Sequence, residues 1–530
     1  MFSLAQWCLN TAQRWAGKAG VRFSPEKTTV MFINKGMFQP LAETQLKLYD
    51  KPLAWSTETK YLGITIDHKL TFKKHLENKI AAAKRKLMIL GNVFKNSWGP
   101  TPRAAKWAYT GIVRPALTYG AIIWAGAAQK EEMRKALKKL DRLALLQIAP
   151  VRKSTPTAAL QIIYDIMPLH IFIWEQALKT SARIGINPNW TPKIGKGHQH
   201  LLYEGLPEEV RRVESDNQTT SLIWEQNYEV IIGKGEDIQR REWACYTDGS
   251  KSGVRAGSGG VVIHKEQLFA NAAYAVRTST VFQAEVSGVL TAAEILLSND
   301  ISNSEIDILV DSQAALMSIR NPITNSKLVT KTKSALNKLG SNNDVKLRWI
   351  RAHKGYKYNE AADINANKGA RMSVHIGNTP CQNRRSIMAA IEEVTKKKWE
   401  TDWEKDPDCR QSKYFMSGPA KTRAKLLLSK TRDEVGQMAR FLTGHAFLRR
   451  QNAIVATGIN PPPGDNSCRM CEDKVMAETP HHLITECDRL WEWRADTLGS
   501  HFLDEYPEWD PISLGKFLSK KEIILLETEE

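Results

Sequence analysis

Between residues 248 and 363, four acidic residues lie where predicted strands end or predicted helices begin. In WACYTDGSKSG, alternating apolar residues indicate a strand, with Asp248 at its end or in the turn that comes next. FQAEVSGVLTAAEILL is typical of a helix with Glu285 in its first turn, and EIDILV predicts a short buried strand that ends at Asp311. A last helix, with Asn359 as its N-cap, carries Asp363. The expected order is βββαβαβα, an α/β fold.

Four acids brought together would repel one another and raise one another's pKa unless cations neutralise them. Magnesium prefers carboxylate oxygens, retains several waters and binds substrate phosphates. Each acid also has an ordinary explanation when taken singly: a turn former, a solvated charge in a first helical turn, or a helix cap. Their common placement, together with the spacing WxxxHxGxxxNExAD that ends at Asp363, favours one site for two Mg²⁺ ions.

The TDGS, FQAEVSG and VDSQ stretches and the loop that leads from His353 to Asp363 resemble the type 1 ribonuclease H domain over residues 241–372. The resemblance implies an RNase H-like domain with a mixed five-stranded sheet and helices. It also implies that His353 assists proton transfer or product release, and that Gln313 and Asn359 contact the substrate. The implied metal ligands are Asp248, Glu285, Asp311 and Asp363. TSTVFQ, before Glu285, lacks the paired asparagines of some cellular members, so contacts with RNA 2′-hydroxyls are expected to differ.

The activity implied is endonucleolytic hydrolysis of the RNA strand of an RNA/DNA hybrid by two metal ions. The alternative is a catalytically inert remnant that still binds nucleic acid. Charge favours a polyanionic partner in either case, because residues 1–240 carry a net charge of +15 within a total of +18. A basic surface can equally be an ordinary solvated one.

Two helices with basic outer faces are expected before the nuclease, one over residues 72–90 and one over residues 133–144. GVRFSPEKTTVMFI and KYLGITID resemble the end of a reverse transcriptase palm and its primer-gripping hairpin. WAYTGIVRPALTYGAIIW and TPTAALQIIYDIMPL resemble the thumb and connection of Jockey-like non-LTR retrotransposon polyproteins. Such polymerases need an aspartate pair before the KT segment, yet the first aspartate here is Asp50 and no two are adjacent. We therefore expect no DNA synthesis.

Three of the seven cysteines lie in SCRMCEDKVMAETPHHLITEC. CxxC, ten residues and then HxxxxC is a spacing typical of four-coordinate structural Zn²⁺. ETPHHLITEC also resembles the CCHC finger of many non-LTR retrotransposon proteins, in which the second histidine aligns with the ligand; His481 is the neighbouring contender. The expected ligands are Cys468, Cys471, His482 and Cys487.

The predicted organisation divides the chain into consecutive parts. They are a truncated reverse transcriptase region (1–190), a linker (191–240), the RNase H domain (241–372), a basic helical region (373–455) and a zinc-knuckle region with an acidic tail (456–530). The scattered Cys8, Cys245, Cys381 and Cys409 argue for a reducing compartment. With no signal peptide pattern or membrane span recognised, we expect a nuclear or cytoplasmic protein that binds nucleic acid and no membrane. The oligomeric state is left open.

Overall fold

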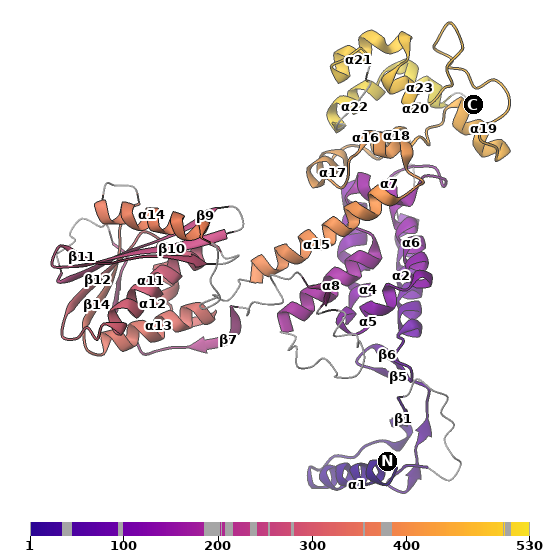
Figure 1. Cartoon of the computed structure of the whole chain (residues 1–530). Coiled ribbons are helices and arrows are strands. Elements are labelled where there is room, and N and C mark those ends of the chain that lie inside the picture. Colours follow the sequence, from indigo (N-terminus) through magenta and orange to yellow (C-terminus); the bar gives the residue numbers. More distant parts are fainter. Residues whose placement is uncertain are drawn as a thin grey trace. The chain divides into compact units, whose positions relative to one another are not determined.

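The computed structural model describes residues 2–33, 45–93, 99–184, 202, 204–206, 216–233, 241–252, 255–276, 280–352, 356–372, 384–501, 503 and 510–528. The chain forms two compact units (Figure 1). One comprises Met1–Ala177 with Thr395–Glu530, and the other comprises Leu178–Val394. The segments before and after the predicted nuclease therefore share one unit, which a division along the chain did not anticipate.

The second unit contains a six-stranded mixed sheet with the order β11-β10-β9-β12-β14-β8. The first three strands pair antiparallel, whereas β9, β12, β14 and β8 pair parallel. The strands are β8 (Glu229–Ile231), β9 (Trp243–Ser252), β10 (Arg255–His264), β11 (Gln267–Val276), β12 (Glu305–Val310) and β14 (Asp344–Trp349). The RNase H-like α/β fold is confirmed, with one more strand than expected.

Helices cover both faces of this sheet (Figure 1). On one face, the apolar sides of α11 (Val281–Ser298), α12 (Gln313–Arg320) and α13 (Lys327–Gly340) enclose the main core. On the other face, α14 (Lys357–Arg371) packs against β10 and β11. The approach is close because β10 carries glycine there: a Cβ at Gly259 would lie 2.1 Å from the carbonyl oxygen of Ala362. A larger residue would push α14 and its Asp363 away from the sheet.

Four details differ from the sequence-based expectation. The stretch 191–240, predicted as a linker, contains β8 and also β7 (Asn217–Leu222), which pairs with β13 (Ile323–Ser326). The strand β8 has only three residues, and β7, with the sequence NQTTSL, is almost entirely polar, so neither shows a clear alternation of apolar residues. The helix α13 is additional to the predicted order. Asp248 lies inside β9 rather than at its end, because the hairpin with β10 continues beyond it. The N-cap of α14 is Tyr356, so Asn359 is the third helical residue.

The helix α11 is long and apolar enough to cross a membrane, and it is the one single helix among the described residues that meets this test. Within its 18-residue window, 61% is buried inside the protein. Val286, Val289 and Ala293 belong to the core beneath the sheet. Its apolarity is therefore explained by its place in a protein core.

The first unit is mainly helical, with short strands near the N-terminus. Its first part contains α1 (Phe2–Lys18), η1 (Pro25–Lys27), β1 (Thr29–Val30), β2 (Lys47–Leu48), β3 (Lys51–Pro52), β4 (Ala54–Trp55), β5 (Glu58–Tyr61), β6 (Ile64–Asp67), α2 (Lys73–Val93), α3 (Pro102–Ala108), the π-helix η2 (Tyr109–Val113), α4 (Arg114–Thr118), α5 (Ala121–Ala128), α6 (Glu131–Leu145), α7 (Thr157–Tyr164) and α8 (Leu169–Ile184). Its second part contains the end of α15 (Arg384–Lys405), α16 (Arg410–Phe415), α17 (Lys421–Leu427), α18 (Arg432–Thr443), α19 (Arg449–Thr457), α20 (Pro480–Thr485), η4 (Asp488–Leu490), α21 (Trp491–Leu498), α22 (Pro511–Leu518) and α23 (Lys521–Thr528). The boundaries between the two units fall within α8 and within α15.

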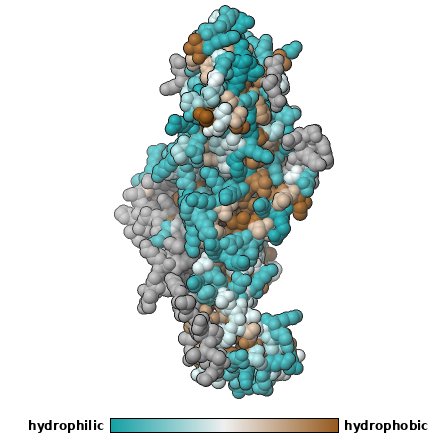
Figure 2. Space-filling view, turned by 90° about the vertical axis from the view of Figure 1, so that its right-hand side faces the viewer, coloured by the Kyte–Doolittle hydropathy of each residue, from teal (hydrophilic) through white to brown (hydrophobic). Residues whose placement is uncertain are grey.

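The two amphipathic helices predicted in this unit are present as α2 and α6. Leu76 and Leu87 of α2, and Leu137 and Leu140 of α6, are buried. The predicted basic face of α6 has one exception: Arg142 donates hydrogen bonds to the carbonyls of Thr155 and Lys153, in the loop before α7, and to Thr157 Oγ1, at the start of α7. Hydrophilic side chains cover much of the surface seen in Figure 2, with hydrophobic side chains in smaller groups.

Candidate active site and metal centre

Asp248, Glu285 and Asp311 come together beside the carboxyl end of β12. Each offers a carboxylate oxygen, and these oxygens lie within 4.8 Å of one another. Asp311 directly follows Val310, which is paired with Thr247 on the adjacent strand β9, so Asp248 is its near neighbour. Glu285 reaches the same point from α11. A Cβ at Gly249 would lie 2.5 Å from the backbone nitrogen of Glu285, so this close approach requires glycine.

The three carboxyls are poorly compensated electrically. Burial is the largest cause that raises the pKa of Glu285 to about 9, and the charges of Asp311 and Asp248 add to it. Burial, followed by the charge of Asp311, raises the pKa of Asp248 to about 7. Glu285 Oε2 is buried and has no hydrogen-bond partner among the described residues. An uncompensated set of hard oxygen donors fits divalent cations such as Mg²⁺.

Asp363 does not belong to the set of three, but it lies beside it. Its charge contributes to the raised pKa of Asp248. Its Oδ1 accepts a hydrogen bond of 2.9 Å from Asn367 Nδ2, one helical turn further along α14. Asn367 Oδ1 in turn accepts a hydrogen bond of 2.5 Å from Ser250 Oγ, on the same side of β9 as Asp248. Sequence reasoning missed Ser250 and Asn367, although the i,i+4 spacing of Asn367 from Asp363 was a usable signal.

The remaining predicted site residues are His353, Gln313 and Asn359. His353 falls outside the described residues. Gln313 is the first residue of α12 and is exposed, close in sequence to Asp311. Asn359 is buried, at 5% exposed, and its Oδ1 has no hydrogen-bond partner among the described residues. Its buried side chain offers little surface to a substrate.

Cys468, Cys471, His482 and Cys487 form a second cluster in the other unit. All four are buried, and their ligand atoms lie within 4.8 Å of one another. Cys471 Sγ is 3.2 Å from His482 Nε2 and 3.7 Å from Cys487 Sγ. Hydrogen bonding with Cys487 is the main cause that lowers the pKa of Cys468 to about 4, so the cluster readily holds a thiolate. Three sulfur atoms and one imidazole nitrogen fit tetrahedral Zn²⁺.

The fold distinguishes the two adjacent histidines. Thr479 caps α20 by accepting a hydrogen bond from the backbone nitrogen of His482, whose ring faces the cysteines. The ring of His481 instead packs at 4.9 Å against Tyr414. His482, as predicted, is therefore the histidine of the cluster.

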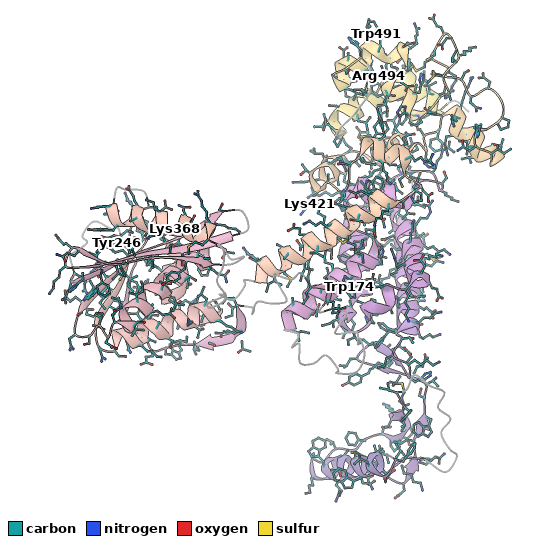
Figure 3. All side chains as sticks on the ribbon, in the orientation of Figure 1. Trp174, Tyr246, Lys368, Lys421, Trp491 and Arg494 are labelled. Carbon is teal, nitrogen blue, oxygen red and sulfur yellow. The ribbon has the colours of Figure 1, made fainter. Side chains whose placement is uncertain are left out.

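Arg494 of α21, labelled in Figure 3, is bonded to the segments that carry this cluster. Its side chain is fully buried and donates hydrogen bonds of 2.8 Å to the carbonyls of Ile484 and Cys487. A further hydrogen bond goes to the carbonyl of His501. The guanidinium thus holds the end of α20, which carries His482, next to the turn that carries Cys487.

Comparison with known proteins agrees with this architecture. Residues 240–371 match the family model for RNase H. The chain is 25% identical over 177 residues to a 115 kDa protein of the type-1 retrotransposable element R1DM from Drosophila melanogaster, which covers 33% of this chain and 17% of that protein. It is 30% identical over 152 residues to the RNA-directed DNA polymerase from the mobile element jockey of the same organism. This match covers 27% of this chain and 15% of that protein.

Among solved structures, the chain is similar to RNase H1 from the halophilic archaeon Halobacterium salinarum. The identity is 21%, the match covers 24% of this chain and 96% of that one, and the TM-score is 0.21. The chain spans less than a fifth of the length of the first R1 relatives that it matches.

Proposed function

For a chain that carries an RNase H domain and is homologous to R1 and jockey non-LTR retrotransposon polyproteins, we propose endonucleolytic hydrolysis of the RNA strand of RNA/DNA hybrids. The observation that carries the proposal is the convergence of Asp248, Glu285 and Asp311 around an unpartnered buried oxygen of Glu285. RNase H proteins usually use divalent metals, and this donor set suits two Mg²⁺ ions.

The roles of the residues follow from their positions. Asp248, Glu285 and Asp311 would hold the ions, and Asp363 would complete the set from α14, where Asn367 orients it. When bound, two such ions activate the attacking water and stabilise the leaving 3′-oxygen. A hybrid would be recognised by its minor-groove shape and its 2′-hydroxyls, so base sequence should matter little.

A hydrolysis assay tests this proposal. The full chain is incubated with labelled RNA/DNA hybrid, single-stranded RNA or duplex DNA, in Mg²⁺ or in EDTA. We expect cutting of the hybrid alone, dependent on the metal and abolished in Asp248→Asn. Asp300→Asn, in the exposed turn after α11, is the matched control and should cut normally. Binding of the hybrid without cutting would instead support the inert nucleic-acid-binding alternative.

We further propose that this chain does not synthesise DNA. Its sequence contains no adjacent aspartates, and its first aspartate is Asp50. A two-metal polymerase site of the kind that this region resembles needs an aspartate pair before the KT segment, which precedes Asp50. Primer extension on an RNA template should therefore give no product, and Mg²⁺-dependent nucleotide incorporation would overturn this part of the proposal.

A further inference from the structure

A cavity of about 310 Å³ lies in the mainly helical unit, between α6, the start of α8 and the end of α15. Its volume is at the lower end of the range for small-molecule sites. The cationic wall comes from α6, and two tryptophans of α15 supply apolar surface. The basic residues of the lining are Arg134, Lys135, Lys138 and Lys405, with His170; the acidic ones are Glu131, Asp141, Asp402 and Asp406, and the aromatic ones are Trp399 and Trp403.

One acid at the bottom of the cavity is already compensated. Asp141 accepts hydrogen bonds from Tyr109, Gln161 and the backbone nitrogen of Leu169. It also forms a buried ion pair of 3.3 Å with Arg114. This carboxylate therefore contributes little repulsion toward an incoming anion.

The cationic side chains of the cavity wall form only long ion pairs or none. Arg134 lies 3.9 Å from a carboxylate oxygen of Glu131 and 4.0 Å from one of Asp402, and both acids are partly exposed. Such long, solvated ion pairs contribute little, so a phosphate can replace them. Among the described residues, Lys138 and Lys405 have no carboxylate within ion-pair distance. Both are exposed to solvent, where they can meet a phosphate.

The inner part of the cavity suits a planar, polar ring. Trp399 and Trp403 are one helical turn apart and are mostly buried, so they present limited apolar surface to the cavity. His170 Nε2 has no hydrogen-bond partner among the described residues and lies 3.5 Å from a carboxylate oxygen of Asp402. Together these groups place two lysines without an ion pair at the rim, and tryptophan surface with one ring nitrogen further in.

We propose that this cavity binds one nucleotide of a single-stranded nucleic acid, with the base inside and the neighbouring phosphates at Lys138 and Lys405. Single strands are held by such a combination, because cations follow the backbone while aromatic surface receives unstacked bases. The net charge of +15 over residues 1–240 is consistent with a polyanion. The inference rests on the proposed function in one respect, that the partner of the chain is nucleic acid.

The test uses two adjacent lysines of α6. Lys138 lines the cavity, whereas Lys139 is exposed and does not line it, so Lys138→Glu and Lys139→Glu change the net charge equally. Binding of the full chain to a fluorescent single-stranded DNA oligonucleotide is measured without added Mg²⁺ and without a chelator, so that the zinc expected in this unit is not removed. We expect Lys138→Glu to weaken binding about tenfold more than Lys139→Glu, with Lys138→Gln intermediate. Equal losses in the two charge reversals would overturn the proposal.

Two further arms identify the ligand. An oligonucleotide with abasic sites should bind the wild type more weakly and respond less to Lys138→Glu, because the base is missing. A free mononucleotide should not displace the strand at concentrations comparable to that of the oligonucleotide; efficient displacement would mean that the cavity takes free nucleotides, contrary to the proposal.

The two proposals fail separately. Lys138→Glu should still cut a short hybrid at the normal maximal rate, since the carboxylates lie in the other unit. Asp248→Asn should bind the single strand as the wild type does. If the wild type does not cut the hybrid but Lys138→Glu still weakens single-strand binding, only the nuclease proposal is rejected.

Discussion

Asp216 Oδ2 accepts a hydrogen bond of 3.2 Å from Gln283 Nε2, which ties a residue before the matched RNase H region to the first turn of α11. The same carboxylate accepts hydrogen bonds of 2.9 Å from Ser326 Oγ and from the backbone nitrogen of Leu328, at the start of α13. Gln283 belongs to the capping box of α11 and lies two residues before Glu285. One buried carboxylate therefore holds the starts of two helices, one of which carries a site residue.

Replacing this carboxylate should loosen α11 locally. We expect Asp216→Ala to destabilise the nuclease unit by about 1–3 kcal/mol, because buried donors lose their acceptor. Since the chain has two units, the suitable measurement is hydrogen exchange of residues 281–298, which should speed up. Asp300→Asn, at an exposed turn where the φ of +53° is one that asparagine also adopts, should leave the exchange unchanged. If the amides of residues 281–298 exchange as slowly in Asp216→Ala as in the wild type, the capping box alone is enough to hold the start of α11.

Asn367 should control metal affinity through Asp363. In Asn367→Leu the carboxylate of Asp363 loses its hydrogen-bond donor, and we expect the Mg²⁺ concentration for half-maximal cutting to rise roughly tenfold. Calorimetric titration with Mg²⁺ checks the same loss without relying on activity. Lys368→Leu alters the neighbouring exposed position on α14 (Figure 3) and should have little effect. Equal affinities in the two variants would contradict an orienting role.

The raised carboxyl pKa values predict a pH dependence of the metal-free protein. Because the folded chain holds protons on Asp248 and Glu285 more tightly than the unfolded chain does, the stability of the nuclease unit is full below the ordinary carboxyl pKa. It is lost as the pH rises through about 7 for Asp248 and about 9 for Glu285. Urea unfolding in EDTA, followed by hydrogen exchange of α11, should show this loss. Glu285→Gln should remove much of this pH-dependent loss of stability. A stability of the wild type that does not change with pH would refute the expectation.

Arg494 should be needed for zinc retention. Its hydrogen bonds to the carbonyls of Ile484 and Cys487 hold two ligand-bearing segments together, and its charge offsets the negative charge of three thiolates around Zn²⁺. We expect Arg494→Met to lose zinc to a chelator much faster than the wild type, as Cys468→Ser should. Arg489→Met, at a largely exposed position, is the matched control. Zinc content by elemental analysis gives the result, and full retention in Arg494→Met would reject the role.

Much of the site was predictable because its signals are local. EIDILV is a buried strand, and Asp311 follows it as the pattern required. The spacing of Cys468, Cys471, His482 and Cys487 identified a cluster that the fold does assemble. In each case the information lies within a strand, a helix or a ligand spacing of a few residues.

Other features depend on contacts between distant residues. Asp216 and Gln283 are 67 positions apart, and the short strand β8 is recognisable only by its pairing with β14. No local pattern indicates that Asp363 lies beside the other three acids rather than among them, since this depends on how closely α14 packs on the glycines of β10.

The amino-acid sequence by itself thus determined the residue types, their order on strands and helices, and the chemistry they can support. The tertiary structure alone decided which carboxylates share one point in space and which side chains orient them. The physical reason is that periodicity and ligand spacing act within a few residues, whereas side-chain direction follows from close packing between elements that are remote along the chain.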